Sequence, residues 1–259
     1  MNFSILPGLV LPLLGTTLGA ALVFFLKGTL NELHQRCFLA MSAGVMAAAS
    51  VWSLLDPAID MSLSMGRLAF APAFAGFWAG VLFLYVLDSI VPHLHRQSSV
   101  PEGLPGKLKR NTMLMIAVTL HNLPEGMAVG VVYAGLGSGA GISEFGALSL
   151  ALGIAFQNFP EGAVVSLPMA AEGVSRPRAF FCGFLSGAVE PCGMLATILL
   201  ASYLTPVMPY LLSFAAGAMF YVIIEELMPE VSRGEHTNLT TLVFCGGFSL
   251  MMALDAALG

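Results

Sequence analysis

Residues 68–90 read LAFAPAFAGFWAGVLFLYVLDSI, a stretch in which Asp88 is the only charged side chain. A helix that crosses the roughly 30 Å hydrocarbon core of a bilayer needs about 20 mainly apolar residues, so this stretch predicts a membrane span. Seven more stretches of this kind lie along the chain. The predicted spans are 5–26, 38–55, 68–90, 112–134, 146–170, 179–203, 206–229 and 240–257. This pattern predicts an all-α integral membrane protein with eight transmembrane helices.

The composition of the whole chain supports this fold class. Of its 259 residues, 57% are hydrophobic and 10% are charged, and the mean hydropathy is +0.86. Soluble domains carry about 25% charged residues, so a cytosolic enzyme, a disordered chain and a nucleic-acid-binding protein are excluded. Four scattered cysteines without a CxxC pair also exclude a disulfide-rich secreted domain. The first apolar stretch is interpreted as a span because it lacks the basic start and cleavage pattern of a signal peptide.

The basic residues indicate the orientation of the chain. Nine of the ten lie on one side of the predicted membrane, and only Arg67 lies on the other. The positive-inside rule places the side with nine in the cytoplasm. We therefore expect both termini outside, residues 91–111 as a cytoplasmic loop between the third and fourth spans, and residues 1–259 as a single transmembrane domain. The nine residues are Lys27, Arg36, Arg96, Lys107, Lys109, Arg110, Arg176, Arg178 and Arg233.

Carboxylates lie within or at the ends of the predicted spans, although no lysine or arginine lies deep within any span. Glu125, Glu161 and Glu190 are near the middle of spans four, five and six. Three unpaired charges there would cost roughly 8–10 kcal/mol, which is comparable with the stability of a whole protein. These side chains must therefore be protonated, hydrated or paired with a cation from outside. The others are Asp88, Glu225, Glu226 and Asp255.

Spans four and five repeat one pattern around their central glutamate. Residues 121–126 read HNLPEG, and residues 157–162 read QNFPEG. The first residue and the glutamate are four positions apart, so they share one helix face. Each proline lacks an N–H and frees the carbonyl four residues earlier, that of Leu120 or Phe156, and such carbonyls are tolerated where they line a polar cavity. Packing between helices explains one intramembrane histidine well, but it explains a doubled motif poorly.

The side chains of this pattern, together with the span-six glutamate, predict a metal site of nitrogen and oxygen ligands. Imidazole, carboxylate and amide oxygens suit zinc, iron(II), manganese and cadmium, and the imidazole favours zinc-like metals. Weak amide ligands suit a metal that is released, so we expect it as transported substrate and expect no cofactor. A closed structural zinc site would use four Cys or His ligands. The predicted ligands are His121, Asn122, Glu125, Gln157, Asn158, Glu161 and Glu190.

A second set of residues could form a release path at the cytoplasmic ends of the spans. A wet interface or a solvated loop explains these residues equally well. They are Asp88, Glu225, Glu226 and Glu230, with His93 and His95 from the PHLH segment of the linker.

These motifs resemble the ZIP (Zrt-, Irt-like protein) family of divalent-metal transporters, in its prokaryotic zinc-transporter branch. The resemblance rests on HNLPEG, QNFPEG, the AVEPCG of span six and the EELMPE of span seven, and it covers essentially the whole chain. It implies a 3+2+3 arrangement with inverted repeats, a homodimer and elevator-like alternating access. It also implies two metals bridged by Glu125 and Glu161. One would add His121 and Gln157, and the other Asn122, Asn158 and Glu190. Many relatives have His in place of Gln157.

We therefore expect a carrier that imports Zn²⁺, and also Cd²⁺, Fe²⁺, Mn²⁺ or Co²⁺, across a prokaryotic inner membrane into the cytoplasm. Its expected partners are divalent metal ions, the lipid bilayer and a second copy of the chain, but no nucleic acid. A divalent-cation or proton channel is an alternative, and its flux would not saturate at low metal concentration. An intramembrane metallo-hydrolase is less favoured, because an HExxH motif places Glu after the first His, and here Asn122 follows His121. We expect no enzymatic activity.

Overall fold

The computed structural model describes residues 5–26, 30–93, 103, 110–136, 142–201 and 207–258. Within these residues, eight helical segments are long and apolar enough to cross a membrane. The prediction of eight spans is confirmed, and the protein is an all-α integral membrane protein. The spans are Leu6–Phe24, Glu32–Asp60, Phe70–Ile90, Met115–Gly135, Glu144–Ala171, Arg176–Leu200, Met208–Val231 and Asn238–Leu258.

Several spans consist of more than one helical element, and the second and seventh each contain a π-helical segment, η3 and η6. The elements are α1 (Leu6–Ala21), η2 (Leu22–Phe24), α2 (Glu32–Ala49), η3 (Ser50–Leu55), α3 (Asp56–Asp60), η4 (Leu63–Leu68), α4 (Phe70–Ile90), α5 (Arg110–Gly135), α6 (Glu144–Ala171), α7 (Arg176–Gly187), α8 (Val189–Ala201), α9 (Met208–Val222), η6 (Ile223–Leu227), α10 (Met228–Val231) and α11 (Asn238–Leu258).

The second span is longer at both ends than the predicted 38–55. It begins at Glu32 because the Asn31 side chain accepts a hydrogen bond from the Leu33 backbone N–H (2.9 Å) and caps a polar first turn. It continues to Asp60 because Pro57 falls in the first turn of α3, where a missing N–H costs little. The polar first turn and the Asp-Pro pair favour loop in the sequence pattern, and the capped and packed helix overrides that preference.

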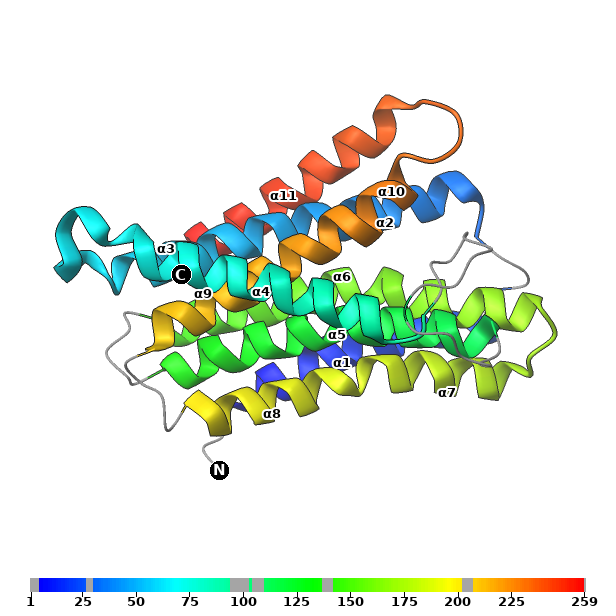
Figure 1. Ribbon diagram of the computed structural model, residues 1–259. Coiled ribbons are helices and arrows are strands. Elements are labelled where there is room, and N and C mark those ends of the chain that lie inside the picture. Colours follow the sequence, from blue (N-terminus) through cyan, green and yellow to red (C-terminus); the bar gives the residue numbers. More distant parts are fainter. Residues whose placement is uncertain are drawn as a thin grey trace.

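The helices form two groups of four spans. The first group contains α1, α5, α6 and the α7–α8 span, in which α1 pairs with α6 and α5 pairs with α8. The second group contains α2, α4, the α9–α10 span and α11, in which α2 pairs with α11 and α4 pairs with α9. Figure 1 shows α1, α7 and α8 at one side of the molecule and α2, α10 and α11 at the other. Contacts of α2 with α6 and of α5 with α9 join the groups.

This pairing has an internal symmetry. In this symmetry, spans one, two and three correspond to spans six, seven and eight, and span four corresponds to span five. The α1–α6 pair then corresponds to the pair formed by α5 and the α7–α8 span. The same correspondence relates the α2–α11 pair to the α4–α9 pair. It also relates η3, which precedes Pro57, to η6, which precedes Pro229. Two inverted repeats of three spans around a central pair would produce this pattern.

Small residues allow the paired helices to approach closely. A Cβ atom added at Gly15 or Gly19 of α1 would collide with the main-chain carbonyl of Ala155 or Phe159 in α6. Closely spaced glycines of this kind let membrane helices pack backbone to backbone. The α6 helix, which carries the second copy of the repeated motif, is therefore held tightly against α1.

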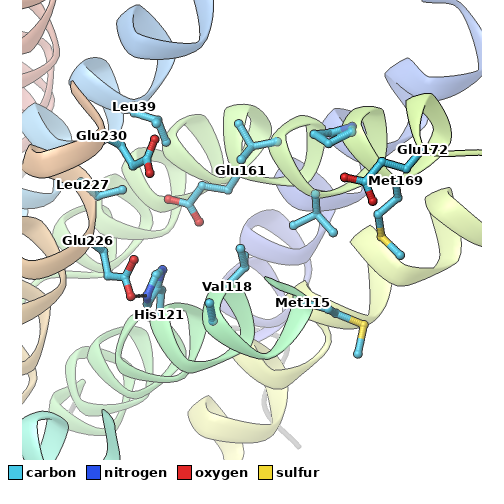
Figure 2. Close-up of a pocket in the computed structure, with 14 residues that line it drawn as sticks. Leu39, Met115, Val118, His121, Glu161, Met169, Glu172, Glu226, Leu227 and Glu230 are labelled. Carbon is cyan, nitrogen blue, oxygen red and sulfur yellow. Dashed lines mark ion pairs between the residues drawn. The ribbon is translucent and has the colours of Figure 1, made fainter. Parts of the chain in front are cut away.

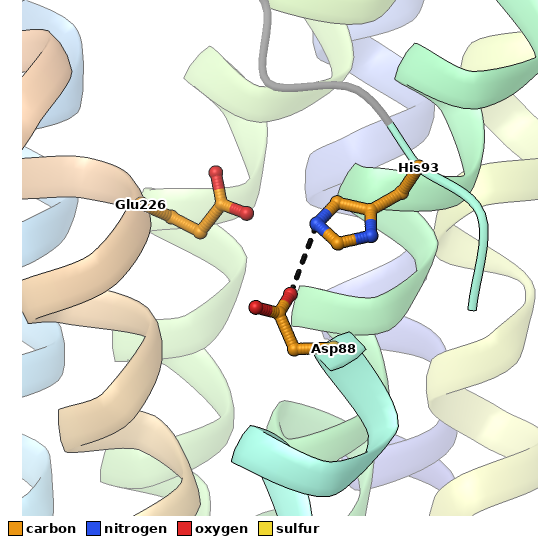
Figure 3. Close-up of side chains that lie close together, drawn as sticks. All are labelled: Asp88, His93 and Glu226. Carbon is orange, nitrogen blue, oxygen red and sulfur yellow. Dashed lines mark ion pairs between the residues drawn. The ribbon is translucent and has the colours of Figure 1, made fainter. Parts of the chain in front are cut away.

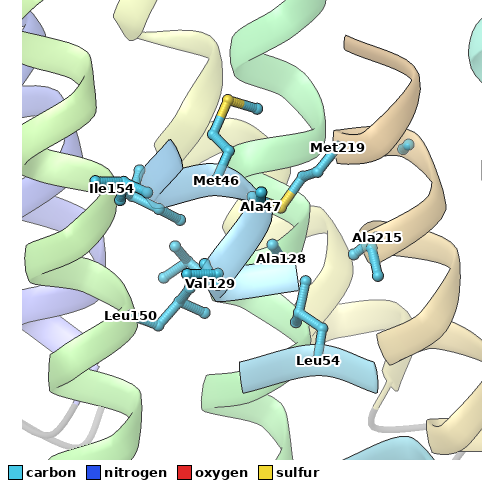
Figure 4. Close-up of a cluster of buried hydrophobic side chains, with 14 of the residues drawn as sticks. Met46, Ala47, Leu54, Ala128, Val129, Leu150, Ile154, Ala215 and Met219 are labelled. Atoms are coloured by element: carbon cyan, nitrogen blue, oxygen red, sulfur yellow. The ribbon is translucent and has the colours of Figure 1, made fainter. Parts of the chain in front are cut away.

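An apolar core fills the junction of the two groups (Figure 4). Side chains of α2, η3 and α9 from the second group pack there against side chains of α5 and α6 from the first. The core residues that Figure 4 labels are Met46, Ala47, Leu54, Ala128, Val129, Leu150, Ile154, Ala215 and Met219.

Candidate metal centre

Six of the seven residues predicted as metal ligands are buried in the middle of the first group. Each is at most 6% exposed, and α5, α6 and α8 supply them. Among the described residues, no lysine or arginine forms a salt bridge with the three carboxylates. A carboxylate buried without a counter-ion is costly, so this cluster requires another source of compensation. The six residues are Asn122, Glu125, Gln157, Asn158, Glu161 and Glu190.

The three prolines of the motifs have different effects on their helices. Both α5 and α6 continue through Pro124 and Pro160 without a break. The sixth span instead breaks at Ala188, between α7 and α8 and three residues before Pro191. This break places Glu190 in the first turn of α8, at the centre of the span.

The glycines that follow the two motif glutamates bring neighbouring helices against the site. A Cβ atom at Gly126 would collide with the main chain of Glu190, and one at Gly162 would collide with the main-chain carbonyl of Thr16. Glycine is therefore required at both positions by the close approach of α8 to α5 and of α1 to α6. The carboxylates of three helices converge because their backbones are this close.

The amide nitrogens of the motif donate hydrogen bonds to the surrounding protein. Gln157 Nε2 donates to Glu125 Oε1 (2.7 Å) and so joins the two motif helices directly. Asn122 Nδ2 donates to the Ser186 carbonyl (2.9 Å) near the end of α7, and Asn158 Nδ2 donates to a main-chain carbonyl of α1 (3.3 Å). With the nitrogens bonded in this way, each amide leaves its oxygen for another partner.

Each of the six buried residues carries one side-chain oxygen that has no hydrogen-bond partner within the described part of the chain. A buried acceptor without a donor costs roughly 1–3 kcal/mol, and native proteins leave few of them. A set of carboxylate and amide oxygens from adjacent helices is the kind of donor set that binds divalent cations. The six atoms are Asn122 Oδ1, Glu125 Oε2, Gln157 Oε1, Asn158 Oδ1, Glu161 Oε2 and Glu190 Oε2.

A cavity of about 80 Å³ leads to this cluster from one end of the molecule (Figure 2). We call it the linker end, because α4 ends and α5 begins there. Glu161, His121 and Glu226 line the cavity beside apolar side chains such as Val118 and Met169. The core between the two groups lies toward the opposite end, since Ala128 and Val129 follow the α5 motif and Leu150 and Ile154 precede the α6 motif. The cavity therefore reaches Glu161 of the cluster from the linker end, and apolar side chains cover the cluster toward the other end.

The seventh predicted ligand, His121, turns toward the second group. Its Nε2 atom lies 3.0 Å from Glu226 Oε1, and the two side chains point toward each other across the cavity in Figure 2. His121 belongs to α5 and Glu226 to η6, so this pair bridges the two groups. The structure thus brings one expected path residue, Glu226, into contact with an expected ligand.

A second cluster lies near the linker end and contains three of the expected path residues. Asp88, His93 and Glu226 are a group in the described chain whose ligand atoms all lie within 4.8 Å of one another. Figure 3 shows the Asp88–His93 pair, 3.0 Å apart, facing Glu226. Burial alone would lower the pKa of His93, but its hydrogen bonds with Asp88 and the Val91 carbonyl outweigh burial and raise that pKa. The arrangement favours a charged imidazole beside two carboxylates.

The remaining expected path residues have different positions. Glu230 lines the cavity that leads to the buried cluster, whereas Glu225 is exposed and does not line it. His95 lies outside the described residues. Glu225 and Glu226 are adjacent in the sequence, but only Glu226 lines this cavity.

The structure adds polar contacts that the motifs do not predict. Thr16 Oγ1 of α1 donates to Glu190 Oε1 (3.0 Å), and the Tyr221 hydroxyl donates to Asp88 Oδ2 (3.1 Å). The sequence signal for Thr16 is weak, since Thr16 is one of two adjacent threonines between Gly15 and Gly19 in an apolar span.

A separate acidic cavity lies at the end opposite the linker end. It is lined by Asp56, Asp60 and Asp255, which come from the second and eighth spans. Ser53 Oγ donates to Asp255 Oδ1 (2.8 Å) and holds the two spans together there. This cavity lies beyond the apolar core from the buried carboxylates.

Eight membrane spans surround a buried set of carboxylate and amide oxygens of the kind that binds cations. This arrangement defines an integral membrane protein with a candidate cation site at its centre. Comparisons with known proteins agree with that class. A family model described as "ZIP Zinc transporter" matches residues 106–255, which is more than half of the chain. The chain belongs to the ZIP zinc transporter family.

Relatives in bacteria and in vertebrates are similar over nearly the full chain. Zinc transporter GufA of Myxococcus xanthus is 40% identical over 97% of this chain and 99% of its own length. Zinc transporter ZIP11 of Xenopus tropicalis is 35% identical over 94% of both chains. Zinc transporter ZIPB of Bordetella bronchiseptica is 36% identical over 94% of this chain and 78% of its own length. The resemblance that the motifs indicate is confirmed.

Proposed function

We propose that the protein is a carrier that moves Zn²⁺ across the membrane into the cytoplasm through the buried cluster of α5, α6 and α8. The observation that carries this proposal is the set of six buried oxygens without hydrogen-bond partners in the described chain. A dication would satisfy several of these oxygens at once and would balance Glu125 and Glu161. The names of the relatives, which are zinc transporters, support zinc as the substrate.

His121 supplies the preference for zinc over harder ions in this proposal. Imidazole suits zinc-like metals, whereas carboxylates and amides alone also suit magnesium and calcium. Release of His121 from Glu226 would free Nε2 for the metal. Cd²⁺, Fe²⁺, Mn²⁺ and Co²⁺ accept the same ligand types, so we propose them as weaker substrates.

We further propose that two metals share the bridging carboxylates of Glu125 and Glu161. In this proposal, His121 and Gln157 would complete one metal position, and Asn122, Asn158 and Glu190 would complete the other. The Gln157–Glu125 hydrogen bond (2.7 Å) supports a metal position that α5 and α6 share, because it places an amide of α6 beside a carboxylate of α5.

Transport in this proposal proceeds by alternating access between the two helix groups. The cluster belongs to the first group alone, while the apolar core that covers it lies between the groups. Movement of the first group along the second, as in an elevator, would uncover the cluster at the opposite end. Acidic side chains on both sides support a path, since Asp56, Asp60 and Asp255 lie at one end and Asp88, Glu226 and Glu230 lie toward the other, with His93 beside them.

The proposed direction of transport follows from the charge pattern. Nine basic residues lie at the linker end or in the segments that join spans there, and the positive-inside rule places such segments in the cytoplasm. We therefore propose that both termini lie outside and that residues 91–111 are cytoplasmic. Bacterial relatives such as GufA support a prokaryotic inner membrane as the location.

Uptake of metal into proteoliposomes tests this function. Purified protein would be compared with a Glu125→Ala/Glu161→Ala double variant, while Cd²⁺, Fe²⁺, Mn²⁺ and Co²⁺ compete with Zn²⁺. We expect saturable zinc uptake that the double variant loses, with competition that ranks the other metals.

Glu144→Gln serves as the matched control, because Glu144 is an exposed carboxylate in the first turn of the same α6 helix. This variant should transport normally. Uptake by the double variant equal to that of the parent would refute the site. Flux that stays linear with metal concentration would favour a channel over a carrier.

A further inference from the structure

A hydroxyl group from α1 reaches the buried carboxylates, although the repeated motifs lie only on α5 and α6. Thr16 is fully buried, and its Oγ1 atom donates to Glu190 Oε1 at 3.0 Å. The other acceptor in reach is the Pro12 carbonyl on the same helix, at 3.5 Å. Threonine in a helix usually bonds that carbonyl, so the shorter distance to Glu190 marks a contact between helices.

Packing holds the Thr16 side chain in this position. A Cβ atom added at Gly187 would lie 2.7–2.8 Å from three Thr16 side-chain atoms, and one added at Gly162 would collide with the Thr16 carbonyl. Gly187 of α7 thus leaves room for the Thr16 side chain, and Gly162 of α6 lets the Thr16 main chain approach closely. The neighbouring Thr17 behaves differently, since it is only half-buried and its hydroxyl donates to the Leu13 carbonyl of its own helix (2.6 Å).

The bonded and unbonded oxygens of Glu190 have distinct environments. Oε1 accepts the Thr16 hydrogen bond, whereas Oε2 is buried with no hydrogen-bond partner in the part of the chain that the structure describes. The terminal torsion of glutamate is broad, so a fixed donor on one oxygen determines where the other points. Partners of ligating carboxylates are known to tune metal affinity by 10–100-fold.

We propose that Thr16 is a positioning residue for Glu190: its hydroxyl holds Oε1 so that Oε2 is presented to the substrate metal. This inference rests on the proposed function, and it extends the site to α1, a helix that supplies none of the predicted ligands. It assigns to Thr16 an effect on metal affinity that acts through Glu190.

Zinc binding to the purified full-length protein in detergent, measured by equilibrium dialysis, tests this role. Thr16→Val replaces the hydroxyl with a methyl group of similar size. Thr16→Ser keeps the hydroxyl, and Thr16→Ala differs from it only by that hydroxyl, so the Ser/Ala pair decides the question if Val does not fold. We expect Thr16→Val and Thr16→Ala to raise the Kd for the zinc ion whose binding requires Glu190 by about tenfold or more. Thr16→Ser and the control Thr17→Val should stay within about twofold.

A double-variant cycle separates positioning from packing. Thr16→Ala combined with Glu190→Gln should bind zinc no more weakly than Glu190→Gln alone, because both changes act on one carboxylate. Additive losses, equal losses in Ser and Ala, or normal binding in both Ala and Val would overturn the proposal. Normal binding in Glu190→Gln would also overturn it.

The proposed function and this inference fail in different ways. If the parent protein neither binds nor takes up zinc, the proposed function fails. If the parent transports zinc and requires Glu125 and Glu161, while Thr16→Ala and Thr16→Ser bind zinc equally, only the role of Thr16 fails.

Discussion

At the scale of single residues, the candidate site differs from a closed zinc site in its use of amides. Asn122, Gln157 and Asn158 each bind the protein through nitrogen and keep a buried oxygen for another partner. Amide oxygens are weak ligands compared with imidazole, so in the proposed site they would lower the affinity for metal without removing a ligand position. Weak ligands suit a substrate that must leave within each transport cycle.

Gln157 is the position where this weakness can be tested. We expect Gln157→His to bind Zn²⁺ roughly tenfold more tightly at neutral pH, because an imidazole nitrogen replaces an amide oxygen beside Glu125. Titration of the purified protein with zinc in a competing chelator would measure the change. A Gln35→His control adds an imidazole near the linker end, where Gln35 donates to the Leu30 carbonyl. If Gln157→His leaves the affinity unchanged, Gln157 is not a ligand.

At the scale of helical elements, the termini of the spans are held by specific polar contacts. Arg36 is buried in the first turns of α2 rather than in a loop before it. Its Nε atom donates to the Val231 carbonyl at the end of α10, and Nη1 donates to the Glu235 carbonyl, both at 3.0 Å. A cation at a helix C-terminus satisfies free carbonyls and interacts favourably with the helix dipole.

Removal of this contact should destabilise the second group. We expect Arg36→Ala to lower the free energy of unfolding by about 1–3 kcal/mol, because it leaves the buried Val231 carbonyl without its donor. Thermal unfolding in detergent would detect the loss as a lower Tm. Arg178→Ala removes an exposed arginine from the first turn of α7 and should leave Tm nearly unchanged. Equal Tm values for the two variants would show that Arg36 does not stabilise α10.

Much of the element order could be predicted from the sequence, since span length and polarity depend only on local composition. The ends of the second span could not, because the Asn31 cap and the packing of Arg36 override local polarity. The π-helical segments η3 and η6 also escape prediction. Their hydrogen bonds span one more residue than those of an α-helix, but this difference leaves no mark in the hydropathy of the sequence. Only their common position before Pro57 and Pro229 hints at them.

The candidate site shows the same division. The repeated motif predicts which residues of α5 and α6 are buried together, because spacing within one helix determines its faces. Contacts between distant segments are not encoded in spacing. The turn of His121 toward Glu226 and the reach of Thr16 to Glu190 therefore emerge only from the packed structure.

At the scale of the whole molecule, the two groups of four spans meet at an apolar core and at the His121–Glu226 pair. Apolar contacts are non-directional, so such a core would let one group slide along the other, as the proposed transport requires. The ion pair is a polar contact between the groups on the cavity side. His121 is also a predicted ligand, so in the proposed site metal binding would compete with this contact between the groups for the same nitrogen atom.

Cysteine accessibility tests whether the groups move. Ile154 of α6 is fully buried in the core between the groups, whereas Ala163 of the same helix is fully buried in a cluster formed within the first group by residues such as Val23 and Ala179. In a background without native cysteines, we expect Ile154→Cys to react with a membrane-impermeant thiol reagent applied at the end opposite the linker end. Movement of the first group would expose this position in the alternate state.

Ala163→Cys is the matched control and should remain unreactive, because its neighbours move with it. Mass spectrometry of the labelled protein would measure both rates, and retained zinc uptake by each variant would establish that the protein is active. A rate at Ile154→Cys as low as that at Ala163→Cys, in protein that transports zinc, would contradict alternating access between the two groups. Transport would then have to occur along a path that leaves this core closed, as in a channel in which the two groups do not move relative to each other.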